Sequence, residues 1–137
     1  MSIYVEGVEE LLKELEDLAS PERTQKGLNK GCLILERAAK QKAKKGATGD
    51  LARTIESRVE GLEGIVFSPL EYAPYVEYGT GLFAEGGGRT DVPWHYQDEK
   101  GNWHTTSGQH PQPFMRPALD ENREQVLRAI REEVLKQ

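Results

Sequence analysis

The sequence predicts an α+β fold, in which N-terminal helices and a long C-terminal helix pack on a small, mostly antiparallel β-sheet with a long glycine-rich loop. Apolar residues recur at helical spacing near both ends, apolar and polar residues alternate in the middle, and glycine-rich turns separate the alternating segments. Helices at the ends with strands between them are typical of α+β proteins. A chain of 137 residues suffices for one core, so we expect a single domain over residues 1–137.

Two helices are expected first. Val5–Leu18 carries a stripe of five apolar residues, namely Val8, Leu11, Leu12, Leu15 and Leu18. Ser20 is a good N-cap and proline suits the first helical position, so the second helix is predicted at Pro21–Lys44. Its buried face is predicted to consist of Leu28, Cys32, Leu35 and Ala39. Gly27 and Gly31 weaken this helix by about 1 kcal/mol each relative to alanine, which indicates that an unidentified element approaches closely there.

A β-hairpin is expected after a short helical turn at 48–53. Ile55, Ser57 and Val59 alternate with polar residues, the turn falls at Gly61–Gly64, and Ile65–Ser68 returns. Gly46 is expected to end the preceding helix.

The middle of the chain is predicted to hold a helical turn, a loop and a second hairpin. Tyr72–Tyr78 is expected to form the turn, which Gly79 ends. Gly81–Asp91 has three consecutive glycines and no apolar period, so it is predicted to be a mobile or contact loop. The arms of the second hairpin are 92–97 and 102–105. A two-residue turn would pair Gln97 with His104, and a three-residue turn would pair Tyr96 with His104.

The last helix is predicted at Arg116–Lys136, with Pro117 in its first turn. Its apolar face is predicted to consist of Leu119, Val126, Leu127, Ile130 and Val134.

Charge is segregated along the chain. The net charge is −5, yet residues 1–20 carry −5 and residues 21–53 carry +6. The positive block ends in a lysine run at 40–45. Cations at the C-terminal end of a helix interact favourably with the helix dipole, so the run suits a helix end. The opposed charges suit pairing, within the chain or between copies.

Membrane insertion, secretion and disulfide bonding are not expected. No apolar run approaches the ~20 residues of a membrane span, and the N-terminus lacks the pattern of a signal peptide. The single cysteine, Cys32, is expected to be a buried structural thiol.

Two kinds of activity remain as alternatives to a structural role. One is a small metal-dependent enzyme that uses His95, His104 and His110, although their spacing matches no zinc pattern of close ligand pairs. The other is a nucleic-acid-binding module that uses Lys40–Lys45 to contact phosphates without reading sequence. No nucleophile or phosphate-binding motif is present, so we expect no enzyme.

Three motifs and the order of the segments resemble the tail-component family of long-tailed bacteriophages, which includes the head–tail connector or neck proteins. The motifs are Thr48-Gly-Asp-Leu51, Tyr72-Ala-Pro-Tyr-Val-Glu-Tyr-Gly-Thr80 and Gln112-Pro-Phe-Met-Arg-Pro-Ala118. The positions that match the family are expected to be structural: Thr48, Gly49, Leu51, Tyr72, Ala73, Tyr75, Val76, Glu77, Gly79, Thr80, Pro113, Phe114, Arg116, Pro117 and Ala118. Among the aromatic residues, Tyr72 and Phe114 are expected in the core.

The resemblance implies a structural virion protein without cofactor, made in the host cytoplasm and located at the head–tail junction. It implies a ring, usually of about six copies, in which different surfaces of neighbouring copies meet head to tail. The implied partners are a head-completion or adaptor protein on one side and the tail tube or its terminator on the other. Non-specific contact with passing DNA is a further expectation.

The interface hypothesis names charged and aromatic residues in two groups. The opposed charges of the first two helices would join neighbouring copies, and the loop with the second hairpin would reach a neighbouring ring. The residues are Glu9, Glu10, Glu14, Lys40, Lys42, Lys44, Lys45, Glu85, Arg89, Trp94 and Trp103.

Overall fold

The computed structural model describes residues 2–3, 20–43, 49–88 and 90–136. Contacts divide the chain into two compact units, one made of residues 1–70 and 114–137 and the other of residues 71–113. The expectation of a single domain stays a prediction. The predicted helix at Val5–Leu18 and the helix end at Gly46 lie outside the described residues.

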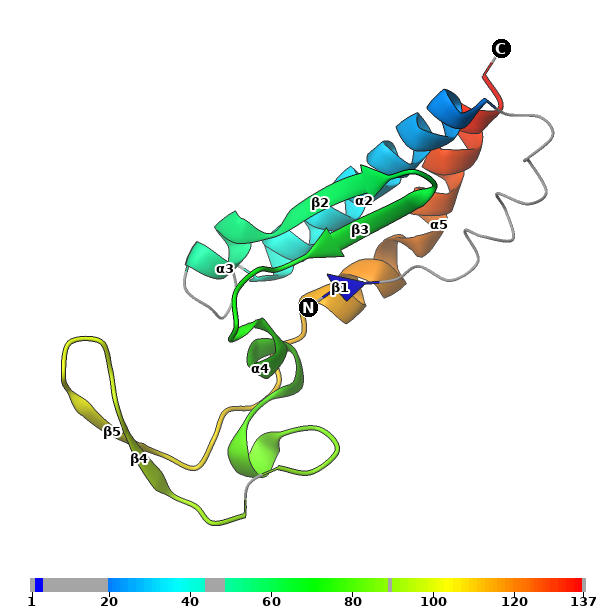
Figure 1. Cartoon of the computed structure of the whole chain (residues 1–137). Coiled ribbons are helices and arrows are strands. Elements are labelled where there is room, and N and C mark those ends of the chain that lie inside the picture. Colours follow the sequence, from blue (N-terminus) through cyan, green and yellow to red (C-terminus); the bar gives the residue numbers. More distant parts are fainter. Residues whose placement is uncertain (1, 4–19, 44–48, 89, 137) are drawn as a thin grey trace. The chain divides into compact units, whose positions relative to one another are not determined.

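In its described residues, the first unit contains two long helices and a three-stranded antiparallel sheet (Figure 1). Helix α2 (Pro21–Ala43) and helix α5 (Met115–Val134) lie side by side. The strand order is β1–β3–β2, and β2 and β3 pack against α2. The strands are β1 (Ser2–Ile3), β2 (Glu56–Glu60) and β3 (Glu63–Phe67). Helix α3 (Gly49–Thr54) precedes β2. The predicted α+β class is confirmed.

Glycines of α2 allow α5 to approach closely. A Cβ atom on Gly27 would lie 3.1 Å from the carbonyl oxygen of Ile130, and one on Gly31 would lie 2.9 Å from Cγ1 of Val126. The element that the sequence left unidentified is therefore α5. The helix-propensity cost of both glycines is offset by this close packing.

The predicted buried face of α2 is confirmed, because its four residues are all buried. Cys32 lies beneath the sheet, where a Cβ atom on Gly64 of β3 would come within 2.6 Å of its Sγ atom. Burial raises the pKa of this thiol to about 11. Cys32 is therefore a structural thiol, as predicted, and is not activated as a nucleophile.

The predicted apolar face of α5 is only partly right. Val126, Ile130 and Val134 are buried, whereas Leu119 and Leu127 are half-buried. Phe114 and Met115, at the start of the helix, are in the core instead, which confirms the expectation for Phe114. The helix starts one residue earlier and ends two residues earlier than predicted, within the usual uncertainty of helix ends.

The second unit contains a short helix, a 3-10 turn and a hairpin. They are α4 (Ala73–Tyr78), η1 (Gly81–Phe83), β4 (Trp94–Gln97) and β5 (Trp103–Thr106). The expected turn at Tyr72–Tyr78 is confirmed, and Gly79, with φ of +82°, ends it. Among the residues that the structure describes, no helix is both long and apolar enough to cross a membrane.

Candidate assembly surface

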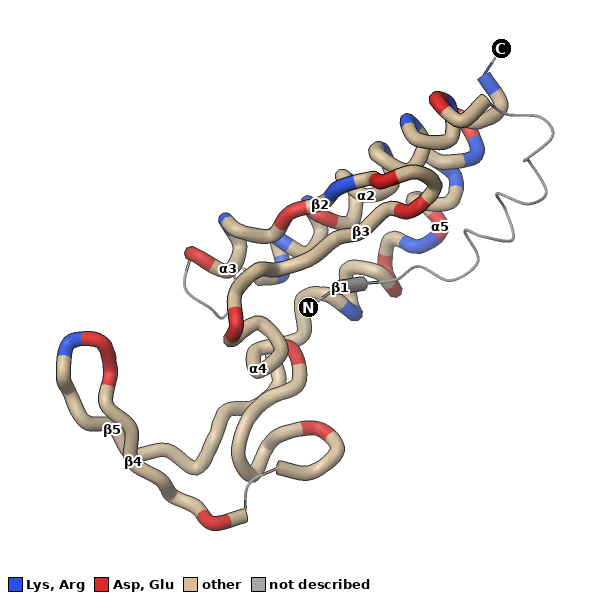
Figure 2. Tube along the Cα trace, in the orientation of Figure 1, with Lys and Arg blue, Asp and Glu red and all other residues tan. Residues whose placement is uncertain are grey.

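The segment from α4 to η1 presents large apolar side chains to solvent. We call five exposed residues of this segment the aromatic patch: Tyr72, Tyr75, Tyr78, Leu82 and Phe83. Tyr75 is the most exposed, at 61%. Glu77 is the one charged residue in 72–84, a segment whose other residues are drawn as uncharged in Figure 2. The side chain of Glu77 is fully buried, so the patch exposes no charge. Aromatic enrichment and charge depletion are typical of the buried centre of protein interfaces.

Backbone hydrogen bonds fix the chain that carries the patch. The amide of Gln112 donates to the carbonyl of Val76 at 2.8 Å, and the amide of Glu85 donates to the carbonyl of Tyr78 at 2.8 Å. The amide of Leu82 donates to the carbonyl of Ser107 at 3.0 Å. The backbone that carries the five side chains is therefore held in place, which lowers the entropic cost of binding a partner.

Two neighbouring motif positions, Gly79 and Thr80, contact the segment at 109–111. The amide of Thr80 donates to the carbonyl of Gln109, and the Thr80 hydroxyl accepts from the Gln109 amide, both at 2.9 Å. A Cβ atom on Gly79 would lie 2.9 Å from both Gln109 O and Pro111 Cδ. Positive φ and the lack of space for a Cβ atom both require glycine at this position. This close contact and the hydrogen bonds of Thr80 hold the segment at 79–80 against the segment at 109–111.

Most of the predicted motif residues that the structure describes are partly or fully buried. Leu51, Ala73, Glu77, Phe114 and Ala118 are fully buried, which suits the structural role expected of them. The expectation that Tyr72 belongs to the core is wrong, because 39% of it is exposed at the start of α4. Thr48 lies outside the described residues.

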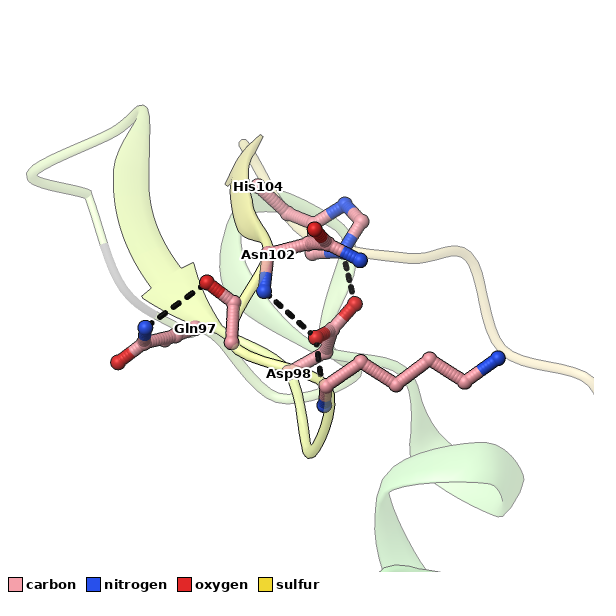
Figure 3. A network of polar contacts seen from close by, with 6 residues as sticks. Gln97, Asp98, Asn102 and His104 are labelled. Atoms are coloured by element: carbon pink, nitrogen blue, oxygen red, sulfur yellow. Dashed lines mark hydrogen bonds and ion pairs between the residues drawn. The ribbon is translucent and has the colours of Figure 1, made fainter.

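The hairpin β4–β5 is closed by a network around Asp98 (Figure 3). Its carboxylate accepts from the amides of Lys100 and Asn102, each at 2.9 Å, and lies 2.7 Å from His104 Nε2. The hydrogen bond from His104, followed by the bond from the Asn102 amide, lowers the pKa of Asp98 below its ordinary value. The network sets the register that pairs Tyr96 with His104, the three-residue alternative.

Both faces of this hairpin are largely exposed. Tyr96 stacks on His104 on one face, with ring centroids 5.2 Å apart. Trp103 lies on the other face and is 71% exposed, whereas Trp94 is half-buried. Of the two tryptophans predicted at an interface, Trp103 is the better placed to contact a partner.

The three histidines have separate contacts. His95 bonds the Thr105 hydroxyl at 2.8 Å, His104 contacts Asp98, and the ring of His110 lies 3.9 Å from that of Phe83. Within residues 2–3, 20–43, 49–88 and 90–136, no three His, Cys, Asp or Glu side chains are grouped to hold a metal ion. These contacts give the metal-enzyme alternative no support.

Three lysines of α2 are paired with carboxylates of the first unit. Lys42 lies 2.6 Å from Glu121 of α5, and Lys40 lies 3.7 Å from Glu36. Lys30, which the sequence did not single out, pairs with Glu133 of α5 at 2.5 Å. The basic block of the sequence is thus partly neutralised by α5, which weakens the nucleic-acid alternative.

Several residues of the interface hypothesis lie outside the described part of the chain, namely Glu9, Glu10, Glu14, Lys44, Lys45 and Arg89. Glu85 is described and exposed. Sequence reasoning missed Leu82 and Phe83 as surface residues. The signal available was an apolar pair directly after Gly81 in an otherwise polar loop.

Comparison with known proteins identifies one family. A family model described as "Bacteriophage HK97-gp10, putative tail-component" matches residues 7–79, more than half of the chain. The matched region includes α2, α3, the β2–β3 hairpin and α4, and it ends at Gly79. No match was found among curated proteins or among solved structures.

Proposed function

Because the chain belongs to the HK97-gp10-like family of bacteriophage tail components, we propose that it forms a ring in the connector that joins the DNA-filled head to the tail. Family membership makes it a structural phage protein that interacts with other structural proteins of the virion. The ring, the connector position and the absence of catalysis are our proposals.

The family match over residues 7–79 carries this proposal. Two of the three motifs that resemble the tail-component family fall within it or at its end, at Thr48–Leu51 and Tyr72–Thr80. A closed ring needs two different surfaces that meet head to tail on neighbouring copies. The aromatic patch on one unit exposes no charge, whereas the β2–β3 hairpin on the other unit exposes carboxylates at its turn, so the chain has two chemically different surfaces of this kind.

The proposed ring docks on a head-completion or adaptor protein and on the tail tube or its terminator. The β4–β5 hairpin is our candidate for the contact with a neighbouring ring. An isolated two-stranded hairpin is marginally stable in water, so a hairpin with both faces exposed gains stability when a partner covers it. The exposed indole of Trp103 suits the anchor of such a contact.

Solution mass tests the proposal. Light scattering over a broad concentration range, at low and moderate salt, is expected to give a closed oligomer of about six copies. Electron microscopy of the same sample is expected to show closed rings. An open-ended series of masses would contradict a closed ring. A monomer at every concentration, alone and with tail tubes or emptied heads added, would contradict the proposed ring function.

A further inference from the structure

We infer that the aromatic patch binds a second copy of this chain, and that the element it binds is the tip of the β2–β3 hairpin, Leu62 between Glu60 and Glu63. The inference rests on the proposed ring, because it names the contact between neighbouring copies.

The patch provides an apolar surface with a hydrogen-bond donor and without exposed charge. Its backbone is held by the bonds to Val76, Tyr78 and Ser107 described above, so little conformational freedom is lost on binding. The Tyr75 side chain is the most exposed of the five and ends in a phenol hydroxyl, which can donate to a carboxylate. A fitting partner is therefore a small apolar protrusion flanked by acceptor groups.

The hairpin tip has this chemistry. Gly61, with φ of +58°, and Leu62 form the two-residue turn, and a Cβ atom on Gly61 would meet no atom within 4 Å. Leu62 is 55% exposed. A leucine at the open end of a tight turn gains from burial, since removing its apolar surface from water is favourable.

The carboxylates beside Leu62 add a second reason for a partner. Glu60 and Glu63 are directly opposite each other in the β2–β3 register, and like charges in this position destabilise a hairpin. Arg58 lies 3.5 Å from Glu60, but both side chains are well exposed and such pairs contribute little. A hydroxyl donor from a neighbouring copy would reduce this repulsion.

These observations favour a second copy of the chain as the partner of the patch, because the aromatic patch and the complementary hairpin tip are present in the same sequence. The tip belongs to the first unit and the patch to the second, so the contact joins different surfaces and repeats head to tail. Among the leucines of the first unit that the structure describes, Leu33 and Leu135 are also exposed. Leu33 lies midway along α2, without a protruding turn, and serves as the matched control.

Cross-linking tests the contact directly. We would purify the Leu62→Cys and Tyr75→Cys variants separately, mix them, and oxidise the thiols with diamide. A disulfide dimer is expected in the mixture at several times the yield of the Leu33→Cys and Tyr75→Cys mixture. The native Cys32 is buried and its pKa is raised to about 11, so wild type gives the background yield. Mixing separate variants ensures that a disulfide between positions 62 and 75 joins two chains.

Assembly of two serine variants separates this inference from the proposed function. Leu62→Ser is expected to raise the concentration for half-assembly about tenfold, whereas Leu33→Ser leaves it unchanged. If rings form normally with Leu62→Ser and the cross-link stays at background, the inference is overturned and the ring stands. If wild type forms no oligomer under any condition, both are overturned.

Discussion

Gly31 of α2 faces Val126 of α5 so closely that a Cβ atom on the glycine would lie 2.9 Å from Cγ1 of the valine. One turn earlier, Gly27 faces the backbone of Ile130 at a similar distance. The two glycines thus mark the line along which the long helices of the first unit touch.

Substitution of Gly31 by valine is therefore expected to destabilise the protein. The overpacking costs about 1–3 kcal/mol, which exceeds the few tenths gained in helix propensity. The expected result is a lower urea midpoint with an unchanged slope. Gln25→Val, at an exposed position of the same helix, is the control and should shift the midpoint little. Equal midpoints for the two variants would show that α5 does not constrain Gly31.

Glu133 is expected to make the free energy of unfolding fall as the solution is acidified. Hydrogen bonds from Lys30 and Lys136 hold the pKa of Glu133 at about 2, below its ordinary value of 4.5. A lowered folded-state pKa means that the stabilisation is complete above about pH 5 and is lost as pH falls toward 2. Glu133→Gln should lower the urea midpoint at pH 7, and the difference from wild type should shrink on acidification.

The neighbouring exposed Glu132 provides the matched control for this titration. Glu132→Gln should leave both the midpoint at pH 7 and its acid dependence nearly unchanged. A difference between wild type and Glu133→Gln that is constant from pH 7 to pH 2 would contradict the role of the ion pair.

Asp98 is expected to order the tip of the β4–β5 hairpin. Asp98→Ala removes the acceptor for the amides of Lys100 and Asn102 and the partner of His104. Faster hydrogen exchange is expected at Asn102, with the amides of α2 and α5 unchanged. The pKa of Asp98 is lowered, so its carboxylate stays charged until the pH falls below the ordinary pKa of an aspartate. Further acidification should protonate it and weaken the same contacts in wild type.

Glu99→Ala, at an exposed position of the same turn, controls for the loss of one negative charge. Unchanged exchange at Asn102 in the Asp98→Ala variant would show that backbone pairing alone closes the hairpin.

Gly79→Ala is expected to loosen the second unit. The φ of +82° strains an alanine by about 1–3 kcal/mol, and its Cβ atom would collide with Gln109 and Pro111. Limited proteolysis should cut the variant within 80–110 faster than wild type. Gly86→Ala separates strain from collision, because Gly86 also has positive φ but open space around it. Similar cleavage of both variants would mean that strain alone matters.

Charge reversal at Glu9, Glu10 and Glu14 tests whether the acidic segment 1–20 of one copy pairs with the basic segment 21–53 of its neighbour in the ring. The triple change to lysine is expected to weaken assembly about tenfold or more at low salt, with a smaller effect at high salt. Light scattering measures the concentration for half-assembly. Unchanged assembly would remove these residues from the interface.

A matched triple reversal on α5 controls for the change in total charge. Asp120, Glu124 and Glu132 are exposed, and lysine at all three gives the same net charge. Assembly as weak as that of the N-terminal variant would show that total charge, rather than position, governs association.

The sequence by itself determined the elements whose signals are local. Ser20 and Pro21 specify the start of α2, and the spacing of apolar residues gives its buried face. Alternation around Gly61 specifies the β2–β3 hairpin, and Gly79 ends α4. Each signal depends on residues within one or two turns of chain, where steric and capping preferences act directly. The motifs likewise placed the chain in its family.

Only the tertiary structure decided which distant segments meet. Gly31 signalled a close approach, but only packing assigned it to Val126, 95 residues later. The sequence left the pairing of His104 open between two registers, because both turns satisfy the same local preferences. Tyr72 was expected in the core since aromatic side chains gain from burial, yet α4 exposes it. Burial and ion pairing depend on the complete set of neighbours, and an isolated motif does not contain that information.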